Sequence, residues 1–266
     1  MNNASHTLVA LCMVISLIVV LSVFFMNSNM NEPFLNNPDT ISKLVSAYVI
    51  NLERNKERLN HFRKSYESAD LGNLIPCNRF EAIDGNTVPV QKYVTPEIFT
   101  GIKEIDATNR RTSMGQLTRG MIGCYLSHLA VYDLALQSSA KYALVFEDDA
   151  SIASDIYGSA IDKILRGDRN VPHDWDIMLL GVICNDCHEY NGEYNVVDDF
   201  FGLHGYLINR RAMELMKTTL PIETQIDIRM SILCREQKLK IYSVIPTKVG
   251  AGDFGTDLQM RIEQTK

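Results

Sequence analysis

Residues 141–150, KYALVFEDDA, form a short apolar run that ends in three consecutive carboxylates. An apolar run of this length with β-branched and aromatic members is typical of a buried strand in a parallel sheet. In open α/β sheets, ligands bind just beyond the carboxyl ends of the strands. Glu147, Asp148 and Asp149 would then lie where such folds place their chemistry, and Mg²⁺ or Mn²⁺ would relieve their mutual repulsion. A solvated acidic turn, which needs no ligand, explains the same residues equally well.

The composition fits a globular chain and excludes one class of partner. The chain has 266 residues, a hydrophobic fraction of 46% and a formal net charge of −6, as expected for one large domain or two small ones. The acidic balance argues against a general nucleic-acid-binding protein, which needs a basic face for the phosphates. Cys184 and Cys187 form a lone CxxC. A loop disulfide or two free thiols is a better interpretation than zinc, because a structural zinc site needs four ligands.

The segment Leu8–Phe25 contains no charged residue, and with Thr7 and Met26 it reaches 20 residues. As a helix it would span about 30 Å, the thickness of the hydrocarbon core of a bilayer. No Lys or Arg precedes it and no A-x-A pattern follows it, which argues against a cleaved signal peptide. We therefore expect a single-pass membrane protein with an N-terminal transmembrane helix in residues 1–26 and a polar stem over residues 27–45. The nearest basic residue is Lys43, so the positive-inside rule does not fix which side of the membrane the remainder faces.

Strand-like and helix-like segments alternate along residues 46–256, which we interpret as one domain followed by a tail at 257–266. Strands are predicted at 47–52, 77–84, 142–146, 175–181, 201–209 and 240–244. Helices are predicted at 53–66, 117–139, 156–165, 211–218 and 226–233. Residues 88–114 and 184–199 are expected to be irregular, the first as a long loop of the kind that often forms a lid. This alternation indicates an α/β domain with a mostly parallel central sheet.

Several polar and small residues fall at positions where they could serve a site. Arg54 and Arg58 are four residues apart, so on a helix they would share a face and could pair with a diphosphate; a solvated helix face is the alternative. Gly120 and Gly123 near the start of the next helix would allow close backbone approach. His128 follows the apolar pattern of that helix and is best interpreted as a core histidine.

Several segments together resemble glycosyltransferase family 25, which includes bacterial lipooligosaccharide galactosyltransferases and collagen hydroxylysine galactosyltransferases. They keep the family's order between residues 47 and 249: YVINLERNKER (48–58), RFEAIDG (79–85), GMIGCYLSH (120–128), ALVFEDD (143–149), DWDIMLLG (174–181), HGYLI (204–208) and PIETQID (221–227). The resemblance implies a GT-A-like fold, a nucleotide-sugar donor and an inverting transfer that usually needs Mn²⁺. Two positions depart from the pattern, since Met121 stands in place of a glutamate and Gly205 in place of an alanine.

The resemblance implies roles for the acidic strand end and its neighbours. Glu147 and Asp149 are the expected ligands of Mn²⁺ or Mg²⁺, which would neutralise the diphosphate as it leaves. Four further residues are expected to contact the nucleotide sugar, with guanidinium groups pairing bidentately with phosphate: Arg54, Arg58, Asp84 and Asp148.

An inverting displacement also needs a general base on the face of the sugar opposite the leaving diphosphate. The base therefore lies outside the acidic cluster. Asp227 is our candidate and His204 the second, although a carboxylate favoured at a helix N-terminus explains Asp227 equally well. The expected donor is a UDP-sugar, with galactose or glucose, and the expected acceptor is a hydroxyl of a glycan, a lipid-linked saccharide or a protein hydroxylysine. Two alternatives stay open: a catalytically inactive nucleotide-sugar- or glycan-binding relative, and a metal-dependent phosphoryl hydrolase.

Overall fold

The structure is a computed structural model of the chain, and it describes residues 37–254. The predicted transmembrane helix, the first part of the stem and the tail lie outside the described residues. Within residues 37–254, no helix is long and apolar enough to cross a membrane. The last part of the segment that we interpreted as a polar stem is helix α2 (Pro38–Leu44), which buries Ile41 completely.

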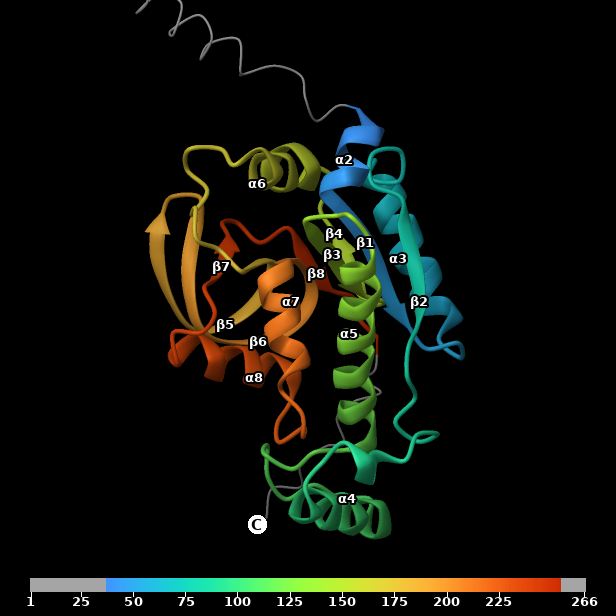
Figure 1. The fold of residues 1–266 in the computed structure, drawn as a ribbon. Helices are drawn as coiled ribbons and strands as arrows, with labels where there is room; N and C mark the ends of the chain where they lie inside the picture. The colour runs from blue at the N-terminus through green and yellow to red at the C-terminus, as the bar shows by residue number, and fades with distance from the viewer. Residues whose placement is uncertain (1–36, 255–266) are drawn as a thin grey trace, which may run out of the picture. The chain divides into compact units, whose positions relative to one another are not determined.

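A six-stranded sheet with the order β2-β1-β3-β6-β5-β7 forms the centre of the domain (Figure 1). Its strands are β1 (Val45–Asn51), β2 (Cys77–Glu81), β3 (Tyr142–Glu147), β5 (Ile177–Asn191), β6 (Tyr194–Asn209) and β7 (Ile241–Val244). β1 is parallel to β2 and β3, and β5 is parallel to β7. β6 is antiparallel to each of its partners β3, β5 and β7. The predicted α/β class is confirmed, but the sheet is mixed rather than mostly parallel.

The reversed strand belongs to a hairpin that the sequence prediction missed. We expected residues 184–199 to form a polar loop, whereas they form the outer half of β5 and β6. The side chain of Asn191 holds the tight turn between the two strands, because its Oδ1 accepts hydrogen bonds from the backbone N–H groups of Glu193 (2.9 Å) and Tyr194 (3.1 Å). So short a turn can join only antiparallel strands, which explains the mixed sheet. Cys184 and Cys187 form a disulfide within β5.

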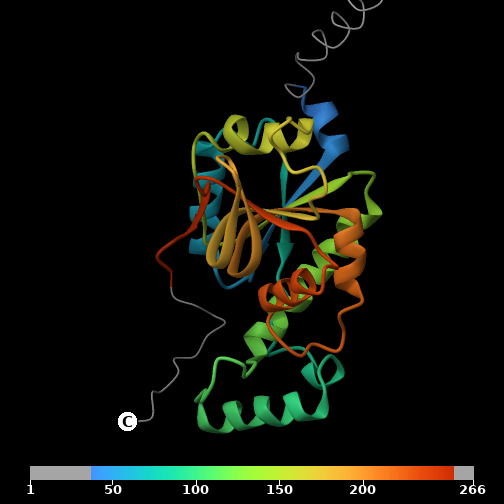
Figure 2. The same ribbon diagram turned by 90° about the vertical axis from the view of Figure 1, so that its left-hand side faces the viewer.

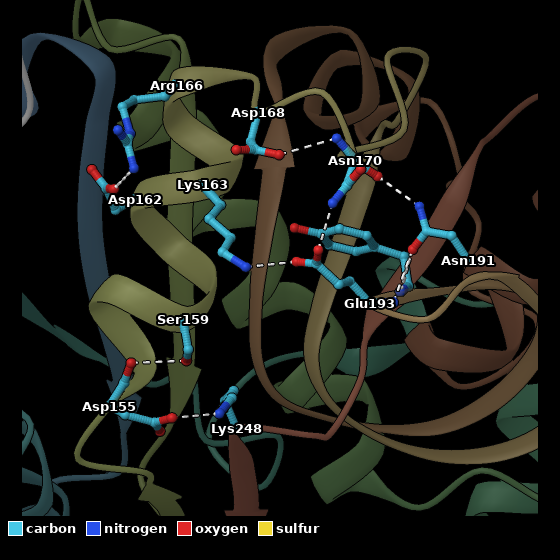
Figure 3. A network of polar contacts seen from close by, with 11 residues as sticks. Asp155, Ser159, Asp162, Lys163, Arg166, Asp168, Asn170, Asn191, Glu193 and Lys248 are labelled. Atoms are coloured by element: carbon cyan, nitrogen blue, oxygen red, sulfur yellow. Dashed lines mark hydrogen bonds and ion pairs between the residues drawn. The ribbon is translucent and has the colours of Figure 1, made fainter. Parts of the chain in front are cut away.

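Polar contacts attach the tip of this hairpin to the segment after the short strand β4 (Ala150–Ile152), as Figure 3 shows. That segment contains a π-helical turn (Tyr157–Ile161) and helix α6 (Asp162–Arg166), where we predicted one helix. Lys163 donates a hydrogen bond to one carboxylate oxygen of Glu193 (2.6 Å), and the side chain of Asn170 donates to the other (2.6 Å). The outer half of the hairpin is therefore held at its tip as well as by its own strand pairing.

Helices cover both faces of the sheet (Figures 1 and 2). Helix α3 (Lys56–Ser68) lies on one face, where Phe62 and Tyr66 contact the ring of Phe146 at centroid distances of 5.4 Å and 5.9 Å. Helices α5 (Arg119–Gln137), α7 (Arg210–Lys217) and α8 (Ile226–Arg235) share a core with the opposite face, which includes Ala143 and Val145. Successive side chains of a strand point to opposite faces, so β3 is buried on both sides.

Residues 88–114 are not the irregular lid that we predicted, because Pro96–Thr108 form helix α4. Thr95 caps this helix by accepting a hydrogen bond from the Ile98 N–H (3.4 Å), and Pro96 occupies the first turn, where its missing N–H costs nothing. Asn109 ends the helix in the left-handed conformation at φ 52°. Helix α4 lies beyond the N-terminal end of α5, away from the sheet (Figures 1 and 2).

Gly123 allows α5 to approach the loop after β2, as we expected of a glycine in this position. A Cβ at Gly123 would lie 2.4 Å from the Ile83 carbonyl oxygen and 2.6 Å from the Gly85 nitrogen. We expect Gly123→Ala to lower the free energy of unfolding by about 1–3 kcal/mol, because backbone must move to admit the methyl group. Gly101→Ala in α4, where a Cβ meets nothing within 4 Å, should instead raise it by about 0.5–1 kcal/mol. Urea unfolding measures both variants, and equal effects would contradict the close approach.

Candidate active site at the acidic strand end

The three carboxylates at the end of β3 contact different neighbours. Glu147 continues the face of Ala143 and Val145 towards α5, as the alternation of strand side chains requires. Asp148 lies on the α3 side, where Arg58 Nε (2.6 Å) and Asn51 Nδ2 (2.7 Å) donate to it. The side chains of Glu147, Asp148 and Asp149 are only 20%, 7% and 17% exposed. The cluster is therefore not a solvated acidic turn.

Glu147 lies between two histidines. Its Oε1 is 3.6 Å from His128 Nε2, and its Oε2 is 3.5 Å from His204 Nδ1, which is 3.4 Å from Asp149 Oδ1. These separations lie beyond the usual range of hydrogen bonds. His128 Nε2, His204 Nδ1 and Asp149 Oδ1 are all buried without a hydrogen-bond partner. Converging buried nitrogen and oxygen atoms of this kind fit a divalent cation such as Mn²⁺.

The charged groups of the cluster shift one another's pKa values. Burial alone would raise the pKa of Glu147, but the imidazoles of His128 and His204 lower it well below its ordinary value. Asp149 and then Glu147 raise the pKa of His204 to about 10. The carboxylates thus favour a positive charge at this position, and a bound cation would supply it in place of the histidine proton.

The first cavity opens beyond the ends of β1, β2 and β3. It is lined by the three carboxylates of the cluster and by Arg54, Arg58, Asp84, Gly120, Ser127 and His128, among others. Arg54 forms an ion pair with Asp84, whose pKa is lowered first by the Asn86 backbone N–H and further by Arg54. Arg58 Nη2 is 2.9 Å from Asp149 Oδ2. Helix α3 begins at Lys56, so Arg54 and Arg58 do not share a helix face as predicted, yet both line this cavity.

The second cavity, of about 610 Å³, lies on the other side of Glu147 and Asp149. Segments of β6, α5 and the start of α8 line it, including Phe201, His204, Met121 and Asp227. Asp227 Oδ2 accepts a hydrogen bond from the Gly202 N–H (3.1 Å), and Oδ1 accepts one from the Ile228 N–H (2.8 Å). Burial raises the pKa of Asp227 above its ordinary value, and the negative charge of Glu147 adds to this shift. Glu147, Asp149 and Cys124 line both cavities.

The sequence indicated eight residues for the site. Each of them lines one of the two cavities or both. Their individual roles stay predictions. Two further residues, Cys124 and His128, were not assigned to it. We interpreted His128 as a core histidine, and it is fully buried with Nδ1 2.7 Å from the Tyr206 hydroxyl, but its Nε2 faces Glu147. The four-residue spacing of Cys124 and His128, which places both on one helix face, was the signal that could have identified them.

Comparison with known proteins agrees with the geometry. Residues 45–230 match the family model described as "Glycosyltransferase family 25 (LPS biosynthesis protein)". The matched residues make up well over half of the chain. The chain belongs to glycosyltransferase family 25.

Individual relatives match over shorter stretches. A "Putative glycosyltransferase" of Haemophilus influenzae is 31% identical over 109 residues, which is 41% of this chain and 33% of the relative. "Procollagen galactosyltransferase 2" of Homo sapiens is 28% identical over 137 residues, 50% of this chain and 20% of the relative. "Probable inactive glycosyltransferase 25 family member 3" of Rattus norvegicus is 24% identical over 137 residues, 51% of this chain and 22% of the relative. The matched part of the chain thus spans a third or less of the length of these relatives.

Proposed function

We propose that this chain is a divalent-metal-dependent glycosyltransferase with a GT-A-like fold. It moves galactose or glucose from a UDP-sugar to a hydroxyl of a glycan, a lipid-linked saccharide or a protein, with inversion at the anomeric carbon. The observation that carries the proposal is the acidic wall of Glu147 and Asp149 between two cavities. A donor in the first cavity and an acceptor in the second would meet at this wall. Residues 1–26 anchor the enzyme in a membrane.

Glu147, Asp149 and His204 would hold Mn²⁺ or Mg²⁺. Bound there, the cation supplies Lewis-acid neutralisation of the diphosphate as it leaves. Arg58 orients Asp149 by binding Oδ2, which leaves Oδ1 directed at His204. Asp148, already paired with Arg58 and Asn51, fixes the guanidinium in place.

The first cavity suits the nucleotide part of the donor. Arg54 and Arg58 place two guanidinium groups along its wall, and guanidinium binds diphosphate oxygens bidentately. Both guanidinium groups form ion pairs with carboxylates of the described residues. A diphosphate would therefore replace or share these carboxylate partners when it binds. Asp84 also lines this cavity and offers acceptor oxygens for ribose or base.

Asp227 is suited to act as the general base. It lies in the second cavity, across the acidic wall from the first, and an inverting displacement needs its base opposite the leaving group. A raised pKa makes a carboxylate a stronger base near neutral pH. His204 is the weaker candidate, because its Nδ1 is directed at Glu147 and Asp149.

Phe201 offers an aromatic surface to an acceptor sugar, since it lines the second cavity and is 38% exposed. We expect Phe201→Ala to raise the KM for the acceptor by about 2–10-fold, the loss of roughly 0.5–1.5 kcal/mol of aromatic contact. The Kd for UDP should not change. Tyr190→Ala is the matched control, an exposed aromatic of the same hairpin that is not part of the cavity lining. A weakened affinity for UDP in Phe201→Ala would contradict the separation of the two cavities.

A non-catalytic binding role is the second candidate, and Met121 favours it. Met121 lines the second cavity, where the family pattern has a glutamate, so one carboxylate of the expected site is missing. A relative named as probably inactive shares the family.

The products formed from UDP-hexoses separate these functions. The full-length chain in detergent is incubated with UDP-galactose or UDP-glucose, Mn²⁺ and a panel of saccharide and hydroxylysine acceptors. Release of UDP that Mn²⁺ stimulates and an acceptor accelerates is the expected result. Release of UMP and hexose phosphate would indicate a phosphoryl hydrolase instead. Binding of the donor without any turnover would indicate the non-catalytic role.

A further inference from the structure

The carboxylate of Glu147 has two oxygens, and each faces a different imidazole. Oε2 faces His204, on the side of Asp149, whereas Oε1 faces His128 Nε2 at 3.6 Å. The proposed function uses only the first of these sides. The second side contains its own set of possible ligand atoms, from Cys124, His128 and Glu147, which all lie within 4.8 Å of one another.

His128 is oriented as a metal-binding histidine usually is. It is fully buried, and its Nε2 has no hydrogen-bond partner. Its other ring nitrogen, Nδ1, lies 2.7 Å from the Tyr206 hydroxyl, which lies 2.6 Å from the Tyr132 hydroxyl. A hydrogen bond at one nitrogen fixes the ring and directs the other nitrogen at a metal ion. Here that nitrogen is directed towards Glu147 and the first cavity.

Cys124 completes the set from the same helix. It is a free cysteine four residues before His128, and side chains four apart on a helix share a face, as in helical two-ligand metal motifs. Cys124 lines both cavities beside Glu147.

We propose that Cys124, His128 and Glu147 form a second cation site, which binds a thiophilic divalent cation such as Zn²⁺. A thiolate and an imidazole favour Zn²⁺ or Co²⁺, whereas the oxygen-rich group of Glu147, Asp149 and His204 suits Mn²⁺. The thiol proton leaves to solvent as the cation binds. Cys124, His128 and Glu147 would supply three protein ligands to such a cation, and Glu147 would be shared with the group of Asp149 and His204. The inference shares Glu147 with the proposed function but does not depend on sugar transfer.

Cobalt absorption tests the site directly. Co²⁺ is added to the full-length chain in detergent without reductant, so that Cys184 and Cys187 stay oxidised, and the near-ultraviolet thiolate-to-cobalt charge-transfer band is recorded. Wild type and Cys77→Ser should show this band, Cys124→Ser should lose it, and added Zn²⁺ should abolish it. The exposed group of Asp186, His188 and Asp198 on the hairpin has no sulfur and cannot produce the band. A band that persists in Cys124→Ser, or no band in wild type, would overturn the proposal.

A second measurement needs no substitution and guards against misfolding of a variant. Zn²⁺ should slow the alkylation of Cys124 in the wild-type chain, followed by peptide mass spectrometry, without slowing that of Cys77, a free cysteine in β2. Equal alkylation rates with and without Zn²⁺ would refute the site. If the wild-type chain shows the cobalt band but no Mn²⁺-dependent transfer, the proposed function alone is contradicted. Transfer without the band would contradict the second site alone.

Discussion

Asp227→Asn is expected to reduce the rate of hexose transfer by roughly 10²–10⁴-fold, the contribution typical of a general base. The amide has the shape of the carboxylate but cannot take up the proton of the acceptor hydroxyl. The amide oxygen can keep one of the two backbone hydrogen bonds that Asp227 accepts, that from Gly202 N–H (3.1 Å) or that from Ile228 N–H (2.8 Å), and the NH2 group cannot accept the other. Thermal unfolding should therefore show a small loss of stability with the fold retained. The affinity for UDP in the presence of Mn²⁺ should not change, because the nucleotide is proposed to bind in the first cavity.

Initial rates of UDP release with acceptor, and calorimetry with UDP, separate these two effects. Glu223→Gln is the matched control: Glu223 precedes the same helix, is 57% exposed, pairs with Arg229 and is not part of the lining of the second cavity. It should leave the transfer rate close to that of wild type. Undiminished transfer in Asp227→Asn would exclude it as the base, and loss of UDP binding in that variant would place it in the donor site instead.

Asp149→Ala is expected to weaken Mn²⁺-dependent binding of UDP by about 100-fold or more. Loss of a residue that merely orients a ligand costs about 10–100-fold in metal affinity, and loss of a ligand costs at least as much. The substitution also removes the partner of Arg58 Nη2 (2.9 Å) and the acidic neighbour of His204 (3.4 Å). Transfer should fall with the loss of the cation.

Asp155→Ala controls for the removal of a carboxylate from the same part of the chain, since Asp155 is 61% exposed and pairs with Lys248. Calorimetric titration of UDP at fixed Mn²⁺ compares the two variants with wild type, and thermal unfolding confirms that both are folded. Equal affinities in Asp149→Ala and wild type would show that the cation, if it binds, is held elsewhere.

The acidic strand end was predictable from sequence because the signal is local. The continuous apolar run from Ala143 to Phe146, fully buried in the structure, and the charged residues that follow define a strand and its end without knowledge of any partner. Arg54, Arg58 and Asp84 follow neighbouring strands, and the carboxyl ends of parallel strands meet at one edge of a sheet. Asp227 was found only through the resemblance to the family, since its own sequence neighbourhood is equally typical of a helix start.

The hairpin and the approach of His128 to Glu147 were not predictable in this way. Residues 184–199 expose many polar side chains to solvent and bury only some, such as Tyr194 and Val197, so their average polarity indicated a loop. The Asn191-Gly192 pair was a valid turn signal. The approach of His128 to Glu147 depends on how α5 packs against β3 and β6, which no local pattern encodes. A buried histidine on an apolar helix face has the same sequence signature whether or not it faces a ligand.

The central claim is that the end of β3 binds a divalent cation and, through it, a uridine nucleotide. Calorimetric titration of UDP into the full-length wild-type chain, once with Mn²⁺ and once with a chelator, tests this most directly. We expect saturable one-site binding with Mn²⁺ and a loss of at least about 100-fold in affinity with the chelator. Binding of equal strength in both conditions would contradict the claim that the acidic cluster holds the nucleotide through a cation.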